Sequence, residues 1–260
     1  MIVFIRHLSF ILCVWMGYAG ELAAENYSEH TETTSITLTE QNIVLNYDQA
    51  VRFSQVLGDT YSYTNNKIYP LGISLISPHK KNLVDQKKAL VLDALKELNT
   101  VEANNLIAQL SDLNFVYREK IETDIEKVRL ISRSNPMLRG QYQLFLSTRP
   151  DYIRIFSGDY EKSFTKPLKA NYDLKDYVSD LPIFSDIHTQ KTGNKKPKYH
   201  SAWVIQPNQD VYLANDIQWA RTLYFLSPGA FIFIELADLP NKHSNLNTDI
   251  AHLLTYYMEP

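Results

Sequence analysis

Apolar and polar residues alternate in two short stretches, residues 36–38 and 43–45. A period of two places neighbouring side chains on opposite faces, so these stretches predict a strand hairpin with one buried face. Helical spacing follows over residues 49–57, with Asp48 in position to cap the helix and Gly58 to end it. The pattern therefore predicts a strand pair followed by a helix.

The longest helical pattern runs through residues 77–114. Ser77-Pro78 suits a first helical turn, and the apolar residues that follow keep to one side. They are Leu83, Val84, Leu90, Val91, Ala94, Leu95 and Leu98. Asn99 and Glu102 have the spacing of a capping box that begins a second helix. Because the link is so short, we predict an antiparallel helical hairpin.

Residues 119–132 combine charged and aliphatic positions, and we interpret them as returning strands of a first domain. Asn135-Pro136 then predicts a turn, because a proline moves the preceding residue out of the helical region. Apolar residues occupy every second position from 142 to 146, and the alternation resumes over 152–156. We therefore predict a second strand hairpin, which opens a second domain at Asn135.

The second domain continues with a short helical pattern at residues 173–178. A strand pair is predicted at 202–205 and 211–213, and a further strand at 223–226. The last run, residues 231–234, is apolar on both faces. It predicts a strand that is central or covered on both sides.

The tail, residues 241–260, has an amphipathic helical pattern. Its apolar face carries Leu246, Ile250, Leu253, Leu254 and Tyr257. Such a helix can dock on its own protein, lie on a membrane or oligomerise into a pore wall. Asp249, His243 and the scarcity of basic residues argue against the membrane, so we favour docking.

The first residues have the pattern of a secretory signal peptide. Arg6 precedes a short apolar run, residues 8–16, and small residues follow it. We expect a signal peptide at residues 1–24, with an uncleaved anchor as the alternative. Cys13, the only cysteine, would leave with it. The mature chain would then depend on apolar burial alone, without disulfides.

Composition excludes several classes of protein. The formal net charge of −3 and the pI of about 6.2 give no strong attraction for nucleic acid or for an anionic membrane. With 45% hydrophobic and 21% charged residues, the chain is not generally disordered. The seventeen tyrosines suit half-buried strands, and tyrosine also stacks on sugar rings.

No motif for catalysis or metal binding is present. The chain lacks the zinc-protease, nucleophile-elbow and phosphate-loop patterns, and its histidines have no helical ligand spacing. We therefore expect no catalytic residue, cofactor or metal. Asp124 with Glu126 and Asp173 with Asp176 are better explained as exposed faces, although a glycosidase pair could form from distant positions.

One stretch resembles a known family. The pattern Asn135-Pro136-x-Leu138-x-Gly140-x-Tyr142, followed by Arg149-Pro150, is similar to the GfcC-type capsule biosynthesis proteins, periplasmic accessories of polysaccharide capsule assembly in Gram-negative bacteria. Further matching positions are Tyr117-Arg118, Arg129, Trp219, Pro228-Gly229 and Leu239-Pro240. Gln141 departs from the pattern, since an aspartate is usual there.

The resemblance implies an α+β fold with two tandem β-grasp (ubiquitin-like, SLBB-like) domains. It places the first domain at residues 25–134, with the helical hairpin 77–114 as an insertion that lies against the second domain. The second domain is residues 135–240, and the C-terminal amphipathic helix is residues 241–260.

The resemblance also implies a non-enzymatic periplasmic protein that assists capsule or exopolysaccharide assembly and export. Its partners would be a polysaccharide or outer-membrane polysaccharide export proteins. A soluble protein is expected rather than one associated with a membrane. The alternatives are a polysaccharide-modifying enzyme and a subunit of an export pore.

Five residues are candidates for binding: Arg118, Tyr117, Arg129, Arg149 and Trp219. Arg118 resembles the family's central pocket arginine. Its five donors could tie domains together or hold a carboxylate or sugar hydroxyls, and both readings stay open. Arg149, ahead of Pro150, would fix a turn.

Overall fold

The computed structural model describes residues 33–64, 67–179, 181, 201–215, 217 and 222–259. The expected signal peptide and Trp219 lie outside the described residues.

The first sheet has the order β2-β1-β6-β4. Its strands are β1 (Thr34–Leu38), β2 (Ile43–Tyr47), β4 (Ser74–Ile76) and β6 (Gly140–Phe145). β1 and β2 form the predicted antiparallel hairpin, and β6 runs parallel to β1 in the centre of the sheet. The helices α1 (Phe53–Tyr61) and α4 (Ile125–Leu130) share a hydrophobic core with this sheet.

The second sheet has the order β10-β9-β11-β7-β8. Its strands are β7 (Tyr152–Phe156), β8 (Phe164–Pro167), β9 (Ala202–Ile205), β10 (Val211–Ala214) and β11 (Phe231–Ile234). β7 and β8 are antiparallel, β11 runs parallel to β7, and α5 (Leu174–Ser179) packs on one face. All four residues of β11 are buried, as its apolar pattern predicts for a central strand.

Both sheets repeat one connectivity, which is a hairpin, a helix, and a late strand that returns parallel to the first. This is the β-grasp arrangement, and the predicted α+β fold with two such modules is confirmed. Each module buries its own core, because its sheet is covered by its own helix.

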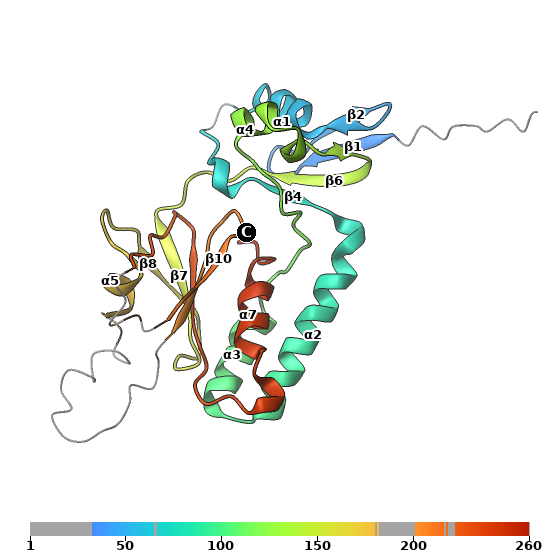
Figure 1. Ribbon diagram of the computed structural model, residues 1–260. Helices are drawn as coiled ribbons and strands as arrows, with labels where there is room; N and C mark the ends of the chain where they lie inside the picture. Colours follow the sequence, from blue (N-terminus) through green and yellow to red (C-terminus); the bar gives the residue numbers. More distant parts are fainter. Residues whose placement is uncertain are drawn as a thin grey trace, which may run out of the picture. The chain divides into compact units, whose positions relative to one another are not determined.

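The helical hairpin consists of α2 (Lys81–Leu98) and α3 (Val101–Ser111). It lies between β4 and β6 in the chain, inside the first module, but its apolar side packs on the second sheet. Leu95 and Leu106 share one core with Phe156 and Phe233. In Figure 1, α2, α3 and α7 lie on the opposite side of the second sheet from α5. The hairpin of one module thus covers the sheet of the other.

The tail helix α7 (Leu246–Leu254) docks on its own chain, between α2 and the second sheet. Leu246, Ile250, Leu253 and Leu254 are buried in the core shared with the hairpin. A 3-10 turn (Asn241–His243) precedes the helix, and Lys242 and His243 both pair with Glu97 of α2. The apolar face of the tail is therefore occupied within the protein.

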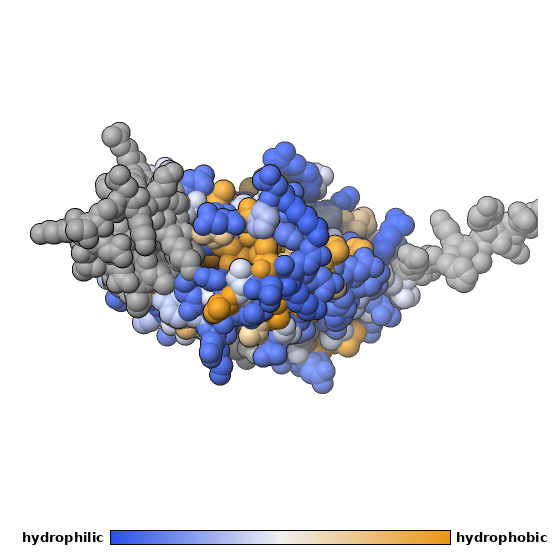
Figure 2. Space-filling view, turned by 90° about the horizontal axis from the view of Figure 1, so that it is seen from below, coloured by the Kyte–Doolittle hydropathy of each residue, from blue (hydrophilic) through white to orange (hydrophobic). Residues whose placement is uncertain are grey.

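No helix among the described residues has both the length and the apolar character needed to span a bilayer. Figure 2 views the molecule from below, from the end where α2 meets α3. Hydrophobic residues occupy the middle of this face, and hydrophilic residues surround them. Val101, the first residue of α3, is 73% exposed.

The predicted hairpin over residues 140–156 is wrong. β6 pairs with β1 and β4, whereas β7 pairs with β8 and β11. Alternation identifies an extended segment and its buried face, but it does not identify the partner strand. Since β6 completes the first sheet, we propose that the first module extends through it and past the expected boundary at Asn135.

The predicted strands over 119–132 are also wrong, because the structure has α4 there. Asp124 caps this helix by accepting from the backbone N–H groups of Glu126 and Lys127. The isolated bridge between Ile76 and Arg118 precedes it, and a 3-10 turn (Ser132–Ser134) follows.

Several predicted helix ends shift. α1 begins at Phe53, later than predicted, because the short strand β3 (Val51–Arg52) precedes it and pairs with β5 (Met137–Leu138). The helix also continues through Gly58 to Tyr61. α3 is capped by Thr100, whose hydroxyl accepts from the Ala103 N–H. Two further 3-10 turns lie at Pro70–Gly72 and Pro78–Lys80.

We predict that Gly158→Ala lowers the free energy of unfolding by about 1–3 kcal/mol. A Cβ at Gly158 would stand 2.7 Å from the Cβ of Glu102, where the turn after β7 meets α3. Asn105 and Gln109 of α3 donate to the Gly158 and Ser157 carbonyls, so this turn has little freedom to retreat. Urea denaturation measures the change.

Gly58→Ala is the matched control, because a Cβ there meets nothing within 4 Å. It should stabilise the protein slightly, since alanine is the better residue inside a helix. Equal effects of the two substitutions would contradict the close contact between α3 and the turn.

Candidate functional site

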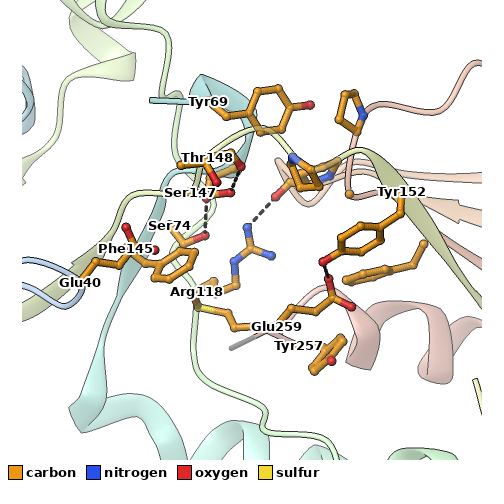
Figure 3. Close-up of a pocket in the computed structure, with 17 residues that line it drawn as sticks. Glu40, Tyr69, Ser74, Arg118, Phe145, Ser147, Thr148, Tyr152, Tyr257 and Glu259 are labelled. Atoms are coloured by element: carbon orange, nitrogen blue, oxygen red, sulfur yellow. Dashed lines mark hydrogen bonds between the residues drawn. The ribbon is translucent and has the colours of Figure 1, made fainter. Parts of the chain in front are cut away.

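A cavity of about 260 Å³ lies where the two modules and the tail meet. Ser74 of β4 and Phe145 of β6 line it from the first module, and Tyr152 of β7 and Phe231 of β11 from the second. The tail contributes Tyr257 through Glu259. Figure 3 shows the guanidinium of Arg118 among these side chains.

Arg118 follows α3 in an extended segment that pairs with Ile76, which brings it beside the first sheet. Its side chain is buried, with 7% of the residue exposed. Nη1 donates to the Thr255 carbonyl at 3.1 Å, and Nη2 donates to the Pro207 carbonyl at 2.5 Å. Burial lowers the pKa of Arg118 to about 10, so the guanidinium stays charged at neutral pH. Arg118 thereby links the first module to the second and to the tail.

One nitrogen of the Arg118 guanidinium has no partner. Its Nε is buried and makes no hydrogen bond within the described part of the chain. A buried donor without a partner costs free energy unless a ligand or a water satisfies it. The cavity therefore offers a fixed positive charge and a free N–H group.

The residues after Arg118 continue the junction. Gln209 donates to the Glu119 carbonyl at 3.2 Å, and Lys120 pairs with Asp210 at 3.0 Å. These contacts hold the turn between β9 and β10 against the segment that carries Arg118. The arginine is positioned from both sides.

The tail closes another side of the cavity through Glu259. Its carboxylate accepts hydrogen bonds from the Tyr152 hydroxyl and from Arg154 Nε. Burial, and then the hydrogen bond to Glu259, raise the pKa of Tyr152 to about 12. Tyr152 therefore stays neutral, and Glu259 is engaged by two donors.

Tyr69 supplies a second buried hydroxyl at the cavity. Burial raises its pKa, while the proximity of Ser227 and Arg149 lowers it in part. Within the described residues its hydroxyl makes no hydrogen bond of normal length. The cavity thus combines two unsatisfied donors, Arg118 Nε and the Tyr69 hydroxyl, with walls of aromatic rings.

The other predicted binding residues lie around this cavity or away from it. Tyr117 is next to Arg118 but packs on Tyr256, with ring centroids 5.5 Å apart. Arg129 is exposed on α4, where it pairs weakly with Glu126 at 3.8 Å. Arg149 lies near the Tyr69 hydroxyl, although its own side chain is exposed. Trp219 lies outside the described residues.

The stretch that begins with Asn135 has a structural role. The Asn135 side chain accepts from the Ser54 N–H and donates to the Ser54 hydroxyl, both at 2.9 Å, and so caps α1. Gly140 has φ +84, a conformation that favours glycine. Gly229 has φ +77 and lies against Pro150. Gly229 and Pro150 both form part of the cavity wall.

Sequence reasoning missed Glu40, Tyr69, Tyr152 and Glu259, which all line the cavity. Tyr152 falls in a predicted strand, but nothing in the pattern distinguishes it from the other tyrosines. Glu259 is the penultimate residue, and its partners are 105 and 107 residues away in the chain. The described residues contain no group of three histidine, cysteine or acidic side chains arranged to hold a metal.

Comparison with known proteins agrees with this architecture. Residues 30–149 match the model of the family described as "Capsule biosynthesis GfcC, N-terminal", and residues 162–259 match "Capsule biosynthesis GfcC C-terminal". The chain is also similar to YjbG of Escherichia coli K12, described as an uncharacterized protein, with 29% identity over 154 residues. That alignment covers 58% of each chain, so this chain spans somewhat more than half the length of that relative. The first match ends after β6, and the second begins after β7 and reaches Glu259. The chain belongs to the GfcC capsule biosynthesis family.

Proposed function

We propose that the protein acts in the periplasm as a non-enzymatic accessory of capsule or exopolysaccharide assembly and export. In this role it binds a glycan, or a segment of an export-machinery partner, in the cavity at Arg118. The family supports a role in capsule assembly. The cavity supports the binding role.

The observation that carries the proposal is the pair of unsatisfied donors in one aromatic-walled cavity. Arg118 Nε has no partner, and the Tyr69 hydroxyl makes no hydrogen bond of normal length although Ser227 lies near it. Phe145, Tyr152 and Tyr257 line the same space. Sugar hydroxyls accept hydrogen bonds from such donors, and the faces of sugar rings pack on aromatic side chains. A glycan unit supplies both the hydroxyl acceptors and the ring faces.

The contacts of four carboxylates support a role without catalysis. Glu259, at the cavity, is engaged by Tyr152 and Arg154. Asp124 caps α4, and Asp173 and Asp176 accept from each other's backbone N–H groups at the start of α5. These carboxylates have structural tasks, whereas a glycosidase needs one acid with a raised pKa opposite a second carboxylate.

The periplasmic location rests on the signal-peptide pattern of residues 1–24. The same pattern leaves a mature chain without cysteine, which needs no particular redox compartment to fold. The apolar face of α7 is buried within the protein, which argues against the use of the tail as a pore wall.

The test is deletion of the gene, with surface polysaccharide as the readout. Loss of surface polysaccharide is expected, and the parent gene should restore it. Thr148→Trp places a large ring at the cavity, where Thr148 is an exposed lining residue, and should fail to restore it. Thr165→Trp, an exposed change on β8, is the matched control and should complement fully.

Unchanged polysaccharide in the deletion strain would overturn the role in assembly. Full complementation by Thr148→Trp would instead overturn the cavity as the binding site. Release of shorter oligosaccharides by the purified protein would contradict the non-enzymatic role.

A further inference from the structure

Residues 127–150 form an unusually basic stretch. They include Lys127, Arg129, Arg133, Arg139 and Arg149 but no aspartate or glutamate. The whole chain, in contrast, has a formal net charge of −3. This concentration of positive charge is local. Arg149 lies at the cavity, near the Tyr69 hydroxyl, whereas Arg129 and Arg133 lie on α4 and in the 3-10 turn after it.

The same stretch exposes large hydrophobic side chains. Leu130, the last residue of α4, is 83% exposed, the highest value among the exposed large hydrophobic residues that the structure describes. Ile131 and Met137 are also exposed. Exposed apolar residues are ordinary when single, but several within one basic segment indicate a contact surface.

The fold brings one more arginine beside Met137. Arg52 of β3 pairs with Met137 of β5 in the short two-stranded sheet, and its Nη1 donates to the Asn135 carbonyl at 3.0 Å. We call the group Arg52, Arg129, Leu130, Ile131, Arg133 and Met137 the arginine–leucine surface. Within the described residues its one ion pair is that between Arg129 and Glu126 at 3.8 Å, with both side chains exposed. Glu122, Asp124 and Glu126 lie just before this surface in the chain, and Glu122 pairs with Lys127. Arg52 and Arg133 make no ion pair within the described residues, so they carry the free positive charge of the surface.

We propose that the arginine–leucine surface docks the protein on an anionic phospholipid bilayer. Arginine forms bidentate hydrogen bonds with headgroup phosphates, while a protruding leucine enters the apolar boundary below them. An anionic polysaccharide would engage the arginines but would leave Leu130 without an apolar partner. The tail helix is not available for this contact, because its apolar face is buried.

The test is co-sedimentation of the purified protein with vesicles. The parent should bind vesicles of phosphatidylcholine with phosphatidylglycerol, bind poorly to phosphatidylcholine alone, and release at high salt. Leu130→Ser should weaken binding about tenfold, because it removes one inserting side chain. Arg129→Gln with Arg133→Gln should weaken it by about 25-fold, at roughly fivefold per arginine.

Leu90→Ser is the matched control, because Leu90 is 73% exposed on α2, away from this surface. It should bind like the parent. Equal binding to both vesicle types would overturn the proposal. So would loss in the arginine variant with unchanged binding of Leu130→Ser, which would identify a site for an anionic polymer. The substituted side chains are exposed, and matching thermal unfolding curves will show that all variants fold.

Discussion

Replacing Leu254 by alanine should lower the free energy of unfolding by about 2–5 kcal/mol. Leu254 is fully buried on α7, in the core that the helical hairpin and the second sheet share. Truncation to alanine would leave a cavity that surrounding helices and strands cannot fill completely. Urea denaturation followed by circular dichroism gives the change in free energy.

Leu90→Ala on α2 is the control for this prediction. The residue type and the substitution are the same, but Leu90 is 73% exposed, so we expect a change within about 0.5 kcal/mol. If both variants lose equally little, α7 does not dock on the protein in solution. The tail would then be free for a membrane or for a partner, as the amphipathic pattern alone allows.

The docked tail shows what a hydrophobic pattern can predict. The spacing of Leu246, Ile250, Leu253 and Leu254 predicted the buried face of α7, because one face of a helix needs one apolar surface to cover it. The pattern could not show which surface that is. In the structure, this surface is formed by α2 and the second sheet.

The pairing of strands was the part of the fold that the sequence predicted least well, because the partner strands lie far apart in the chain. The alternation in β6 predicts an extended segment, but β6 joins β1, which lies about a hundred residues earlier in the chain. Nearby β7 was the natural choice as a partner, because sequential strands usually pair. The inserted helical hairpin separates the strands of the first module in the chain, so a pattern of neighbouring residues cannot show that β6 pairs with β1.

α4 was misread for a different reason. Ile121, Ile125 and Val128 have helical spacing, but a six-residue helix is too short for the period to stand out among charged residues. The cap by Asp124 was the stronger signal. A short polar side chain in the N-cap position indicates the start of a helix more specifically than scattered aliphatic residues indicate a strand.

The candidate site was only partly predictable. The resemblance to the family indicated Arg118, and its place after the helical hairpin indicated a junction. Its partners are the carbonyls of Pro207 and Thr255, which every residue possesses, so no side-chain pattern could indicate them. Long-range contacts to backbone atoms leave no signature in a single sequence.

Replacing Arg118 by alanine should lower the free energy of unfolding by about 2–3 kcal/mol. The substitution leaves the Pro207 and Thr255 carbonyls without their donors, while it removes the cost of burying a charge. Arg118→Lys should lose less, because an ammonium group retains the charge and can still reach one acceptor. Urea denaturation of the three proteins measures the series.

Lys120→Ala is the control at the same junction. Its ion pair with Asp210 is exposed, so we expect a loss of no more than about 1 kcal/mol. If Arg118→Ala is instead as stable as the parent, the two hydrogen bonds only balance the cost of burial, and the arginine does not hold the modules together. A stable Arg118→Ala protein that fails to restore surface polysaccharide would then make ligand recognition the reason for the arginine. A destabilised one that still restores it would make its role structural.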